Sequence, residues 1–266
     1  MAEETPCRPA PARRRYPHPM SRFTVHDINP GVEIRVTRRM PPLSVPLDHA
    51  VEALWTAAAA RVEPGGAGRL FNGQVFSIDA ISPGLITGHM TEYRRVIAQT
   101  ENHALYGDLG IRSLAVCGVL RCADGILIGR RPPAAVYQPG LWQLCPAGSV
   151  DASAVQPDGR IDARGQLLTE IREELGLSPE TIGAITPLCI VEHPGSHVCD
   201  FGLMANVARD ASAVMAAHRE NGNGEYDPLR IVPVEDLPPF IIKNIETLVP
   251  PAPIFLVRAG MMAGQG

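Results

Sequence analysis

The sequence lacks any long apolar run. No stretch approaches the roughly 18 residues that a membrane-spanning helix needs, so we expect no membrane segment. The N-terminus lacks the apolar core of a secretory signal, which favours a cytoplasmic location. A strong basic charge is also missing, because 24 Lys and Arg residues stand against 28 Asp and Glu, giving a net charge of −4. This balance argues against a nucleic-acid binder.

The cysteines show no metal-binding or disulfide pattern. The chain has six cysteines and no Cys-x-x-Cys pair. Four of them, Cys117, Cys145, Cys189 and Cys199, lie in strand-like apolar runs, where a cysteine usually behaves as a small buried hydrophobic residue. His197 and Cys199 have no second pair at ligand spacing, so we expect no zinc site.

The chain divides into four predicted segments. Residues 1–22 are rich in Pro and Arg and are predicted to be a disordered basic tail. Residues 23–108 are predicted to form an accessory α+β region, and residues 109–250 the main domain. Residues 251–266 are expected to be a C-terminal tail. The 25 Gly and 26 Pro residues predict many turns and long loops.

Hydrophobic periodicity predicts a mixture of strands and helices. The expected strands are 31–38, 73–81, 114–120, 126–130, 142–145, 185–192, 198–207 and 231–234. The expected helices are 47–62, 91–99, 163–175 and 239–248, and residues 211–218 stay undecided. Because strands and helices do not alternate strictly, we predict an α/β fold with a mixed sheet between layers of helices.

Three glutamates in the predicted helix 163–175 point to a chemical role. Glu170, Glu173 and Glu174 stand at i, i+3 and i+4, which gathers their carboxylates on one side of a helix. Like charges at this spacing repel, and Mg²⁺ is an oxygen-seeking cation that would remove the repulsion. Leu168, Ile171 and Leu175 form an apolar stripe beside them, and Gly176 ends the helix. The alternative is an ordinary solvated acidic face.

The sequence around these glutamates resembles the Nudix box, the loop and helix that bind metal and diphosphate in Nudix hydrolases. The second half of the box matches over residues 170–177, and residues 146–151 resemble the loop that precedes it. Further segments that resemble the family are 129–131, 140–144 and 229–237. The resemblance implies an αβα sandwich with a mixed sheet, a Mg²⁺ cofactor with Mn²⁺ as an alternative, and hydrolysis of a nucleoside diphosphate linked to another group.

Two features depart from the family pattern. The arginine that orients the first glutamate of the helix in the family is replaced by Thr169. The loop between Gly148 and Thr169 is about seven residues longer than the family pattern and lacks a clear counterpart of the family's loop glutamate. Asp151, Asp158 and Asp162 are the alternatives for that role.

These departures, together with two short motifs, suggest a subgroup. Residues 69–76 and 91–94 are similar to segments of the Nudix-type UDP-glucose pyrophosphatases. That similarity implies cleavage of UDP-glucose or UDP-galactose to UMP and a sugar 1-phosphate.

Several residues are candidates for the site. Glu173 and Glu174 are the leading metal ligands, with Glu170 as a ligand or as the base that orients water. Gly148 would let backbone N–H groups approach the phosphates closely. The substrate-binding candidates are Arg130 and Arg131, which could pair with phosphate oxygens or lie on the surface, and Tyr137, which could stack on a base or pack its own loop. Glu192, Glu225, Asn72 and Arg94 are further candidates, while Phe71 and Phe76 are expected to pack the accessory strand.

Other functions stay open at this point. A non-catalytic sensor of nucleotide sugars is one, because Thr169 and the missing loop glutamate could weaken catalysis. Within the same enzyme class, ADP-ribose, dinucleotides or coenzyme A compounds are alternative substrates. The predicted partner is a small-molecule nucleoside diphosphate derivative, and the oligomeric state is open, with a homodimer as one option.

Overall fold

A mixed β-sheet forms the centre of the molecule. In the computed structural model, which describes residues 23–61, 70–133, 135 and 137–263, the strand order is β1-β9-β10-β5-β6-β11, with β7 paired to β6 and β8 paired to β5. These strands are β1 (Thr24–Asp27), β5 (Leu114–Cys122), β6 (Gly125–Arg130), β7 (Trp142–Leu144), β8 (Ala147–Ser149), β9 (Thr186–Glu192), β10 (Cys199–Asn206) and β11 (Leu229–Val232). Only β10 and β5 run parallel among these pairs. The predicted tail 1–22 and Cys7 lie outside the described residues.

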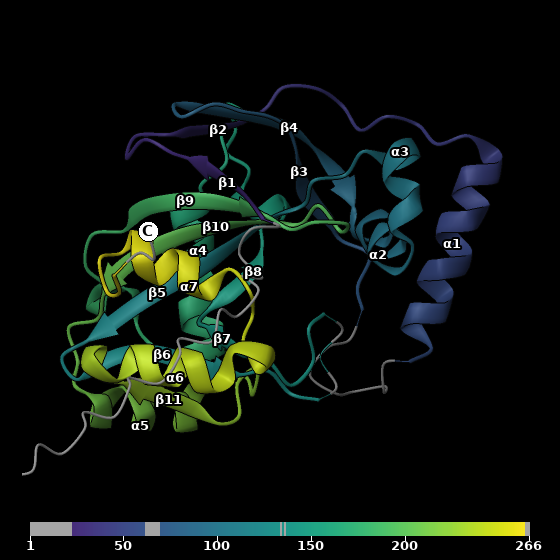
Figure 1. Ribbon diagram of the computed structural model, residues 1–266. Helices are drawn as coiled ribbons and strands as arrows, with labels where there is room; N and C mark the ends of the chain where they lie inside the picture. Colours follow the sequence, from purple (N-terminus) through teal and green to yellow (C-terminus); the bar gives the residue numbers. More distant parts are fainter. Residues whose placement is uncertain (1–22, 62–69, 134, 136, 264–266) are drawn as a thin grey trace, which may run out of the picture.

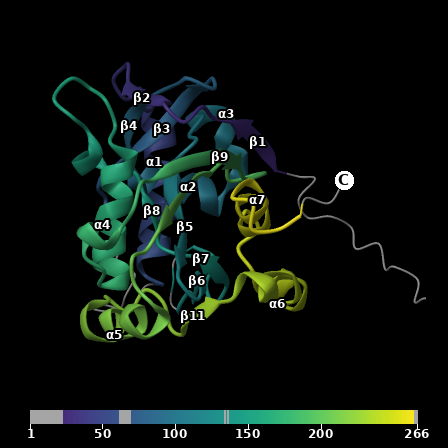
Figure 2. The same cartoon turned by 90° about the vertical axis from the view of Figure 1, so that its left-hand side faces the viewer.

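Helices cover both faces of this sheet because successive side chains of a strand point to opposite faces. Leu127 of β6 joins one apolar core, whereas its neighbours Ile126 and Ile128 join the other. Helices α4 (Ala163–Leu175) and α5 (Ala211–Asn221) cover the first face, and α6 (Leu237–Asn244) and α7 (Ala252–Arg258) cover the second (Figure 2). The predicted α/β fold, with a mixed sheet between helices, is confirmed.

The accessory region packs against the same core. Its small sheet has the order β2-β4-β3, formed by β2 (Glu33–Val36), β3 (Gln74–Ile81) and β4 (Leu85–Glu92), and α1 (Val45–Ala59), α2 (Tyr93–Glu101) and α3 (Tyr106–Leu109) lie beyond it (Figure 1). Phe76, Ile78 and Ile86 belong to the core under α4. Strand β1 falls within the predicted range 23–108 but pairs with β9, so the separate part of the accessory region begins after Asp27.

The remaining elements are short 3-10 turns. They span His103–Leu105, Ala152–Ala154, Pro179–Thr181, Val234–Asp236 and Ile245–Thr247. None of the helices within the described ranges has the length and apolar character needed to cross a membrane.

The expected C-terminal tail 251–266 contains a helix instead. Phe255 and Leu256 of α7 are fully buried in the second core, and the Phe255 ring lies directly over Gly202 of β10. A side chain at position 202 would collide with that ring. The prediction of a tail is therefore wrong for residues 252–258, because their apolar side chains cover one face of the sheet.

Candidate functional site

Helix α4 is fixed at both ends and along its buried face. The Asp162 carboxylate accepts a hydrogen bond from the Gly165 N–H at 2.8 Å and caps the first turn. Gly176 ends the helix with a φ of +66°, a conformation that glycine adopts without steric cost. Leu167, Ile171 and Leu175 are completely buried. The neighbouring face of the helix therefore presents Glu170 and Glu174 to β8.

Glu170 lies against the backbone of β8. Its carboxylate occupies the space that a Cβ atom at Gly148 would need, so this close approach requires a glycine. Gln166, one turn earlier, donates a hydrogen bond from Nε2 to Glu170 Oε1 at 2.8 Å. Burial raises the pKa of Glu170 to about 7, and the nearby negative charge of Glu173 adds to the effect.

Glu174 is the most deeply buried acid of the cluster. Only 6% of its surface is exposed, and its Oε2 accepts a hydrogen bond from the Ala147 N–H at 3.1 Å. Burial and the charge of Glu170 raise its pKa well above the usual value. The hydroxyl of Tyr226 and the Oε1 atom of Gln166 are also buried, and neither has a hydrogen-bond partner among the described residues. This corner of the site therefore contains polar atoms whose hydrogen-bonding capacity is unused.

Glu173 behaves differently from the other two helix glutamates. Its side chain is 56% exposed and forms only a distant ion pair with Arg172, at 3.8 Å. Across the described part of the chain, no group of three or more His, Cys, Asp or Glu side chains is arranged to hold a metal ion. The helix brings Glu170 and Glu174 together at β8, whereas Glu173 lies mostly in solvent, and its role as a metal ligand stays a prediction.

Glu225 joins the cluster from outside the helix. It lies in the loop after α5, and its negative charge contributes to the raised pKa values of Glu170 and Glu174. Arg131 stands on its other side, with a nitrogen 3.4 Å from Glu225 Oε1. Sequence analysis listed Glu225 as one further candidate. Its position near α4 follows from the fold, because the loop that carries it packs against the end of that helix.

Arg130 and Arg131 are placed on different sides of the sheet. Arg130 follows Ile126 and Ile128 in alternation, lies over the Trp142 ring at 5.9 Å and donates to the Gly140 carbonyl oxygen. Arg131 lies on the acidic side, near Glu225. Strand alternation therefore places the exposed Arg130 on the α6 side of the sheet, and the prediction that either arginine binds phosphate stays a prediction.

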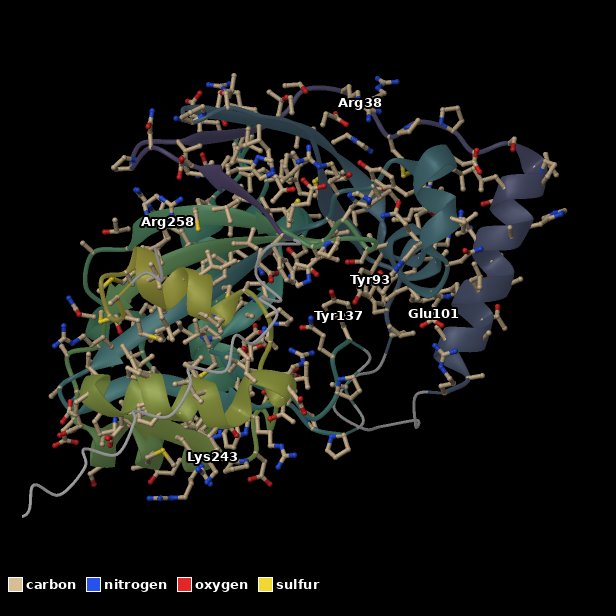
Figure 3. The ribbon with its side chains drawn as sticks, viewed as in Figure 1. Arg38, Tyr93, Glu101, Tyr137, Lys243 and Arg258 are labelled. Atoms are coloured by element: carbon tan, nitrogen blue, oxygen red, sulfur yellow. The ribbon has the colours of Figure 1, made fainter. Side chains whose placement is uncertain are left out.

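Two tyrosines stand near Arg131. The backbone oxygen of Tyr137 accepts a hydrogen bond from Arg131 Nε at 3.1 Å. Burial raises the pKa of the Tyr137 hydroxyl to about 12. Tyr93, from α2 of the accessory region, lies close enough to Arg131 and Glu225 for their charges to act on its hydroxyl. Figure 3 labels both rings between the accessory helices and the main sheet. Tyr93 is an accessory-region residue near this site that the sequence analysis did not name.

Other candidate residues are engaged in structural contacts. Glu192 accepts hydrogen bonds from Arg112 at 2.6 Å and His197 at 2.8 Å. Arg94 forms ion pairs with Asp48 at 2.8 Å and Glu92 at 3.0 Å. These partners leave neither Glu192 nor Arg94 free for a ligand.

The sequence also predicted burial of the accessory phenylalanines and of four cysteines. Phe76 is buried as expected, but Phe71 is 80% exposed, which corrects the expectation that both pack inside. Asn72 accepts a hydrogen bond from the Arg94 backbone N–H at 3.0 Å and so supports the start of α2. The four cysteines expected to be buried, Cys117, Cys145, Cys189 and Cys199, are buried free thiols.

Surface hollows lie away from the acidic cluster. The largest of three has a volume of about 610 Å³ and lies between α5, β11 and α6, with Arg230 and Lys243 on its rim. The other two are lined by residues around Arg209 and around Arg160. None of these three hollows includes Glu170 or Glu174. The acidic cluster is a candidate site because of its charges and its contacts at β8.

Comparisons with known proteins give similarities in fold. Neither a scan against models of known protein families nor a search of curated proteins finds a match. Among solved structures, a NUDIX family hydrolase from Clostridium perfringens is 15% identical, with a TM-score of 0.37 over 56% of this chain and 95% of that one. A bifunctional NMN adenylyltransferase/ADP ribose pyrophosphatase from Francisella tularensis, solved with AMP and a Mn ion, is 14% identical, with a TM-score of 0.42 over 64% and 49%. An Ap4A hydrolase from C. elegans is 16% identical, with a TM-score of 0.34 over 55% and 93%. Each alignment is partial and each TM-score lies below 0.5, so these similarities identify neither a family nor a substrate for this chain.

Proposed function

We propose that the protein is a divalent-metal-dependent hydrolase of the Nudix type, which cleaves the diphosphate of a nucleoside diphosphate linked to another group. The observation that best supports this proposal is the pair of Glu170, which is half-buried, and Glu174, which is buried, because one turn of α4 presents both carboxylates at β8. Strongly perturbed acids of this kind cluster at functional sites more often than elsewhere.

The residues present fit a hard divalent cation. Burial raises the pKa of both acids. The charge of Glu173 adds to this effect at Glu170, and the charge of Glu170 adds to it at Glu174. Mg²⁺ commonly binds proteins through one or two carboxylates, with water and substrate phosphates completing its shell. Glu170 and Glu174 would hold it, and the negative charge of Glu225 adds to the attraction for a cation. When bound, such an ion neutralises phosphate oxygens and lowers the pKa of a coordinated water.

Other residues have roles toward the substrate. The Arg131 guanidinium supplies a fixed positive charge beside the acidic cluster, suited to a phosphate oxygen. Gly148 makes room for the Glu170 carboxylate, and its expected role toward the phosphates stays a prediction. The Ala147 N–H is used by Glu174 and so is not available to a phosphate.

The position of Gln166 favours a catalytic function of the protein over a purely sensing one. In the resemblance to the Nudix box, Thr169 replaces the arginine that orients the first glutamate. Here the Thr169 hydroxyl donates to the Gly165 carbonyl oxygen at 3.2 Å and does not contact Glu170. Gln166 holds Glu170 instead, at 2.8 Å. The sensor hypothesis depended on a missing contact to Glu170. Gln166, on the preceding turn, supplies such a contact.

The substrate that the sequence motifs favour is a UDP-sugar, cleaved to UMP and a sugar 1-phosphate. The test is incubation of the purified protein with Mg²⁺ or Mn²⁺ and a panel of UDP-glucose, UDP-galactose, ADP-ribose, a dinucleotide and a coenzyme A compound. Release of a nucleoside monophosphate from UDP-glucose or UDP-galactose at the highest kcat/KM supports the proposal. Preference for another member of the panel retains the enzyme class and rejects the UDP-sugar assignment. Folded protein that releases product from no compound rejects both.

A further inference from the structure

Three polar side chains, of which His193 is buried and Asp200 and Tyr137 are half-buried, connect the main sheet to the loop that follows Arg131. Asp200 stands on β10, and its Oδ2 atom lies 2.8 Å from His193 Nε2 at the end of β9. The other ring nitrogen of His193, Nδ1, lies 3.4 Å from the Tyr137 hydroxyl. That second distance is long for a hydrogen bond, whereas the first is typical of a strong one. His193 is only 5% exposed, and Phe23 covers it with an edge-on ring contact.

With a neutral His193 ring, one arrangement of protons satisfies this chain. A carboxylate is only an acceptor, so His193 Nε2 carries a hydrogen and donates it to Asp200. The neutral ring can then accept at Nδ1, where the Tyr137 hydroxyl is the available donor. Burial raises the pKa of Tyr137 to about 12, which keeps that hydroxyl protonated at neutral pH. The direction of donation is therefore from Tyr137 to His193 and from His193 to Asp200.

Tyr137 also holds Arg131 through its backbone. The Tyr137 carbonyl oxygen accepts from Arg131 Nε at 3.1 Å, and Gln143 Oε1 accepts from another Arg131 nitrogen at 2.8 Å. These two contacts fix the plane of the guanidinium and leave its remaining N–H groups on the side where Glu225 stands. The position of Tyr137 therefore determines where Arg131 presents its free donors.

The accessory helix α2 supports the turn that carries His193. Gln99 is 1% exposed and donates to the Ser196 carbonyl oxygen at 2.9 Å, in the turn between His193 and Val198. That turn contains His197 with a φ of 57°, and the residue after Tyr137, Gln138, has a φ of 50°. Positive φ values are uncommon outside glycine, and surrounding contacts must hold them in place.

We propose that Asp200, His193 and Tyr137 are positioning residues, which fix the Arg131 guanidinium for the phosphate groups of the substrate. The proposal rests on the proposed function. Burying a carboxylate and a histidine costs free energy, and apolar side chains would fill this space without that cost. The hydrogen bonds from Asp200 through His193 to Tyr137 hold the residue whose carbonyl oxygen binds Arg131. This positioning role accounts for polar groups at a place where their burial costs free energy.

The test is a double-mutant cycle on kcat/KM with the substrate found in the panel. Tyr137→Phe removes only the hydroxyl, and we expect kcat/KM to fall about three- to tenfold, mainly through KM. His193→Gln should act in the same direction. In an Arg131→Gln background, Tyr137→Phe should change kcat/KM less than twofold, because the residue that it positions is gone. Tyr106→Phe is the matched control, since Tyr106 stacks on His197 outside the chain and should leave kcat/KM within twofold.

Two kinetic results would overturn the proposal. One is an unchanged KM in Tyr137→Phe when the wild type is active. The other is an equal loss from Tyr137→Phe in the wild-type and Arg131→Gln backgrounds, which would mean a general structural role, and this would accompany a fall in melting temperature.

A binding measurement separates this proposal from the proposed function. Calorimetric titration with inorganic pyrophosphate and Mg²⁺ needs no turnover. If the wild type hydrolyses nothing but binds pyrophosphate, the proposed function fails, while a three- to tenfold weaker Kd in Tyr137→Phe and an unchanged Kd in Tyr106→Phe support the positioning chain. Equal Kd values in the wild type and Tyr137→Phe overturn the chain, as does a wild type that neither binds pyrophosphate nor hydrolyses substrate.

Discussion

At the scale of single residues, the candidate site depends on how Glu170 is held. Two neighbours set its position, because Gly148 provides the space for its carboxylate and Gln166 donates the hydrogen bond that orients it. Each neighbour can be altered without removing the acid itself. The resulting variants test whether the position of the carboxylate matters beyond its presence.

We predict that Gly148→Ala loses activity while the protein stays folded. The added methyl group would displace the Glu170 carboxylate, which is the flexible end of a side chain, so the stability cost should stay near or below about 1 kcal/mol. The rate should fall at least tenfold, because small displacements in catalytic geometry are expensive. Gly107→Ala, where a methyl group meets open space, is the control and should retain full activity. Equal activity in both variants would contradict the role of Gly148.

We also predict that Gln166→Ala lowers kcat about tenfold, while Thr169→Ala changes it less than twofold. The first substitution removes the 2.8 Å contact to Glu170, and the second removes a hydroxyl that bonds only to Gly165. Steady-state kinetics with saturating Mg²⁺ measures both. The opposite order of effects would show that Thr169, and not Gln166, substitutes for the family's arginine.

At the scale of elements, sequence patterns predicted the helices and strands with strong hydrophobic periodicity. They missed the elements whose residues give conflicting signals. Helix α4 has its predicted bounds because Asp162 and Gly176 provide clear start and stop signals. Strand β4 was missed because Gly88 and His89 interrupt its apolar pattern, although both lie inside the small sheet. Helix α7 was missed because Pro251 and Pro253 suggested a loop, whereas proline is compatible with the first turn of a helix.

Helix α7 should matter for stability. Phe255 is fully buried over Gly202, so we predict that Phe255→Ala lowers the free energy of unfolding by about 3–5 kcal/mol. Ile242 on α6 is 66% exposed, and Ile242→Ala should change stability by no more than about 0.5 kcal/mol. Urea denaturation measures both changes. A loss below about 1 kcal/mol in Phe255→Ala would mean that α7 does not complete the second core.

At the scale of the whole molecule, sequence alone could name the acidic helix but not its surroundings. The spacing of Glu170 and Glu174 follows from the helical repeat and was predictable. The arrival of Glu225 and Tyr93 beside Arg131 depends on how distant segments pack, which local patterns do not encode. Strand alternation from Ile126 could have separated Arg130 from Arg131, because that rule needs only the register of one strand.

Several segments also meet at Glu192, and this gives a prediction for pH. Burial opposes ionisation of Glu192, but hydrogen bonds from Arg112 and His197 outweigh it and hold the pKa below the usual value. A lowered pKa stabilises the fold above the unfolded-state value near 4.5, and this contribution is lost as pH falls through the folded-state pKa. We predict that Glu192→Gln lowers stability at pH 7 by about 1–3 kcal/mol and flattens its decline below pH 4.5, measured by thermal unfolding. Parallel pH curves for both proteins would contradict this.

The most direct test of the account is the rate of nucleoside monophosphate release with and without Mg²⁺ in four proteins: wild type, Glu170→Gln, Glu174→Gln and Glu173→Gln. Glu170 and Glu174 are held at β8, whereas Glu173 is mostly exposed. We predict metal-dependent release by the wild type, loss of at least a hundredfold in Glu170→Gln and Glu174→Gln, and a smaller loss in Glu173→Gln. Full activity in both Glu170→Gln and Glu174→Gln, or release that does not depend on a divalent metal, would contradict the account.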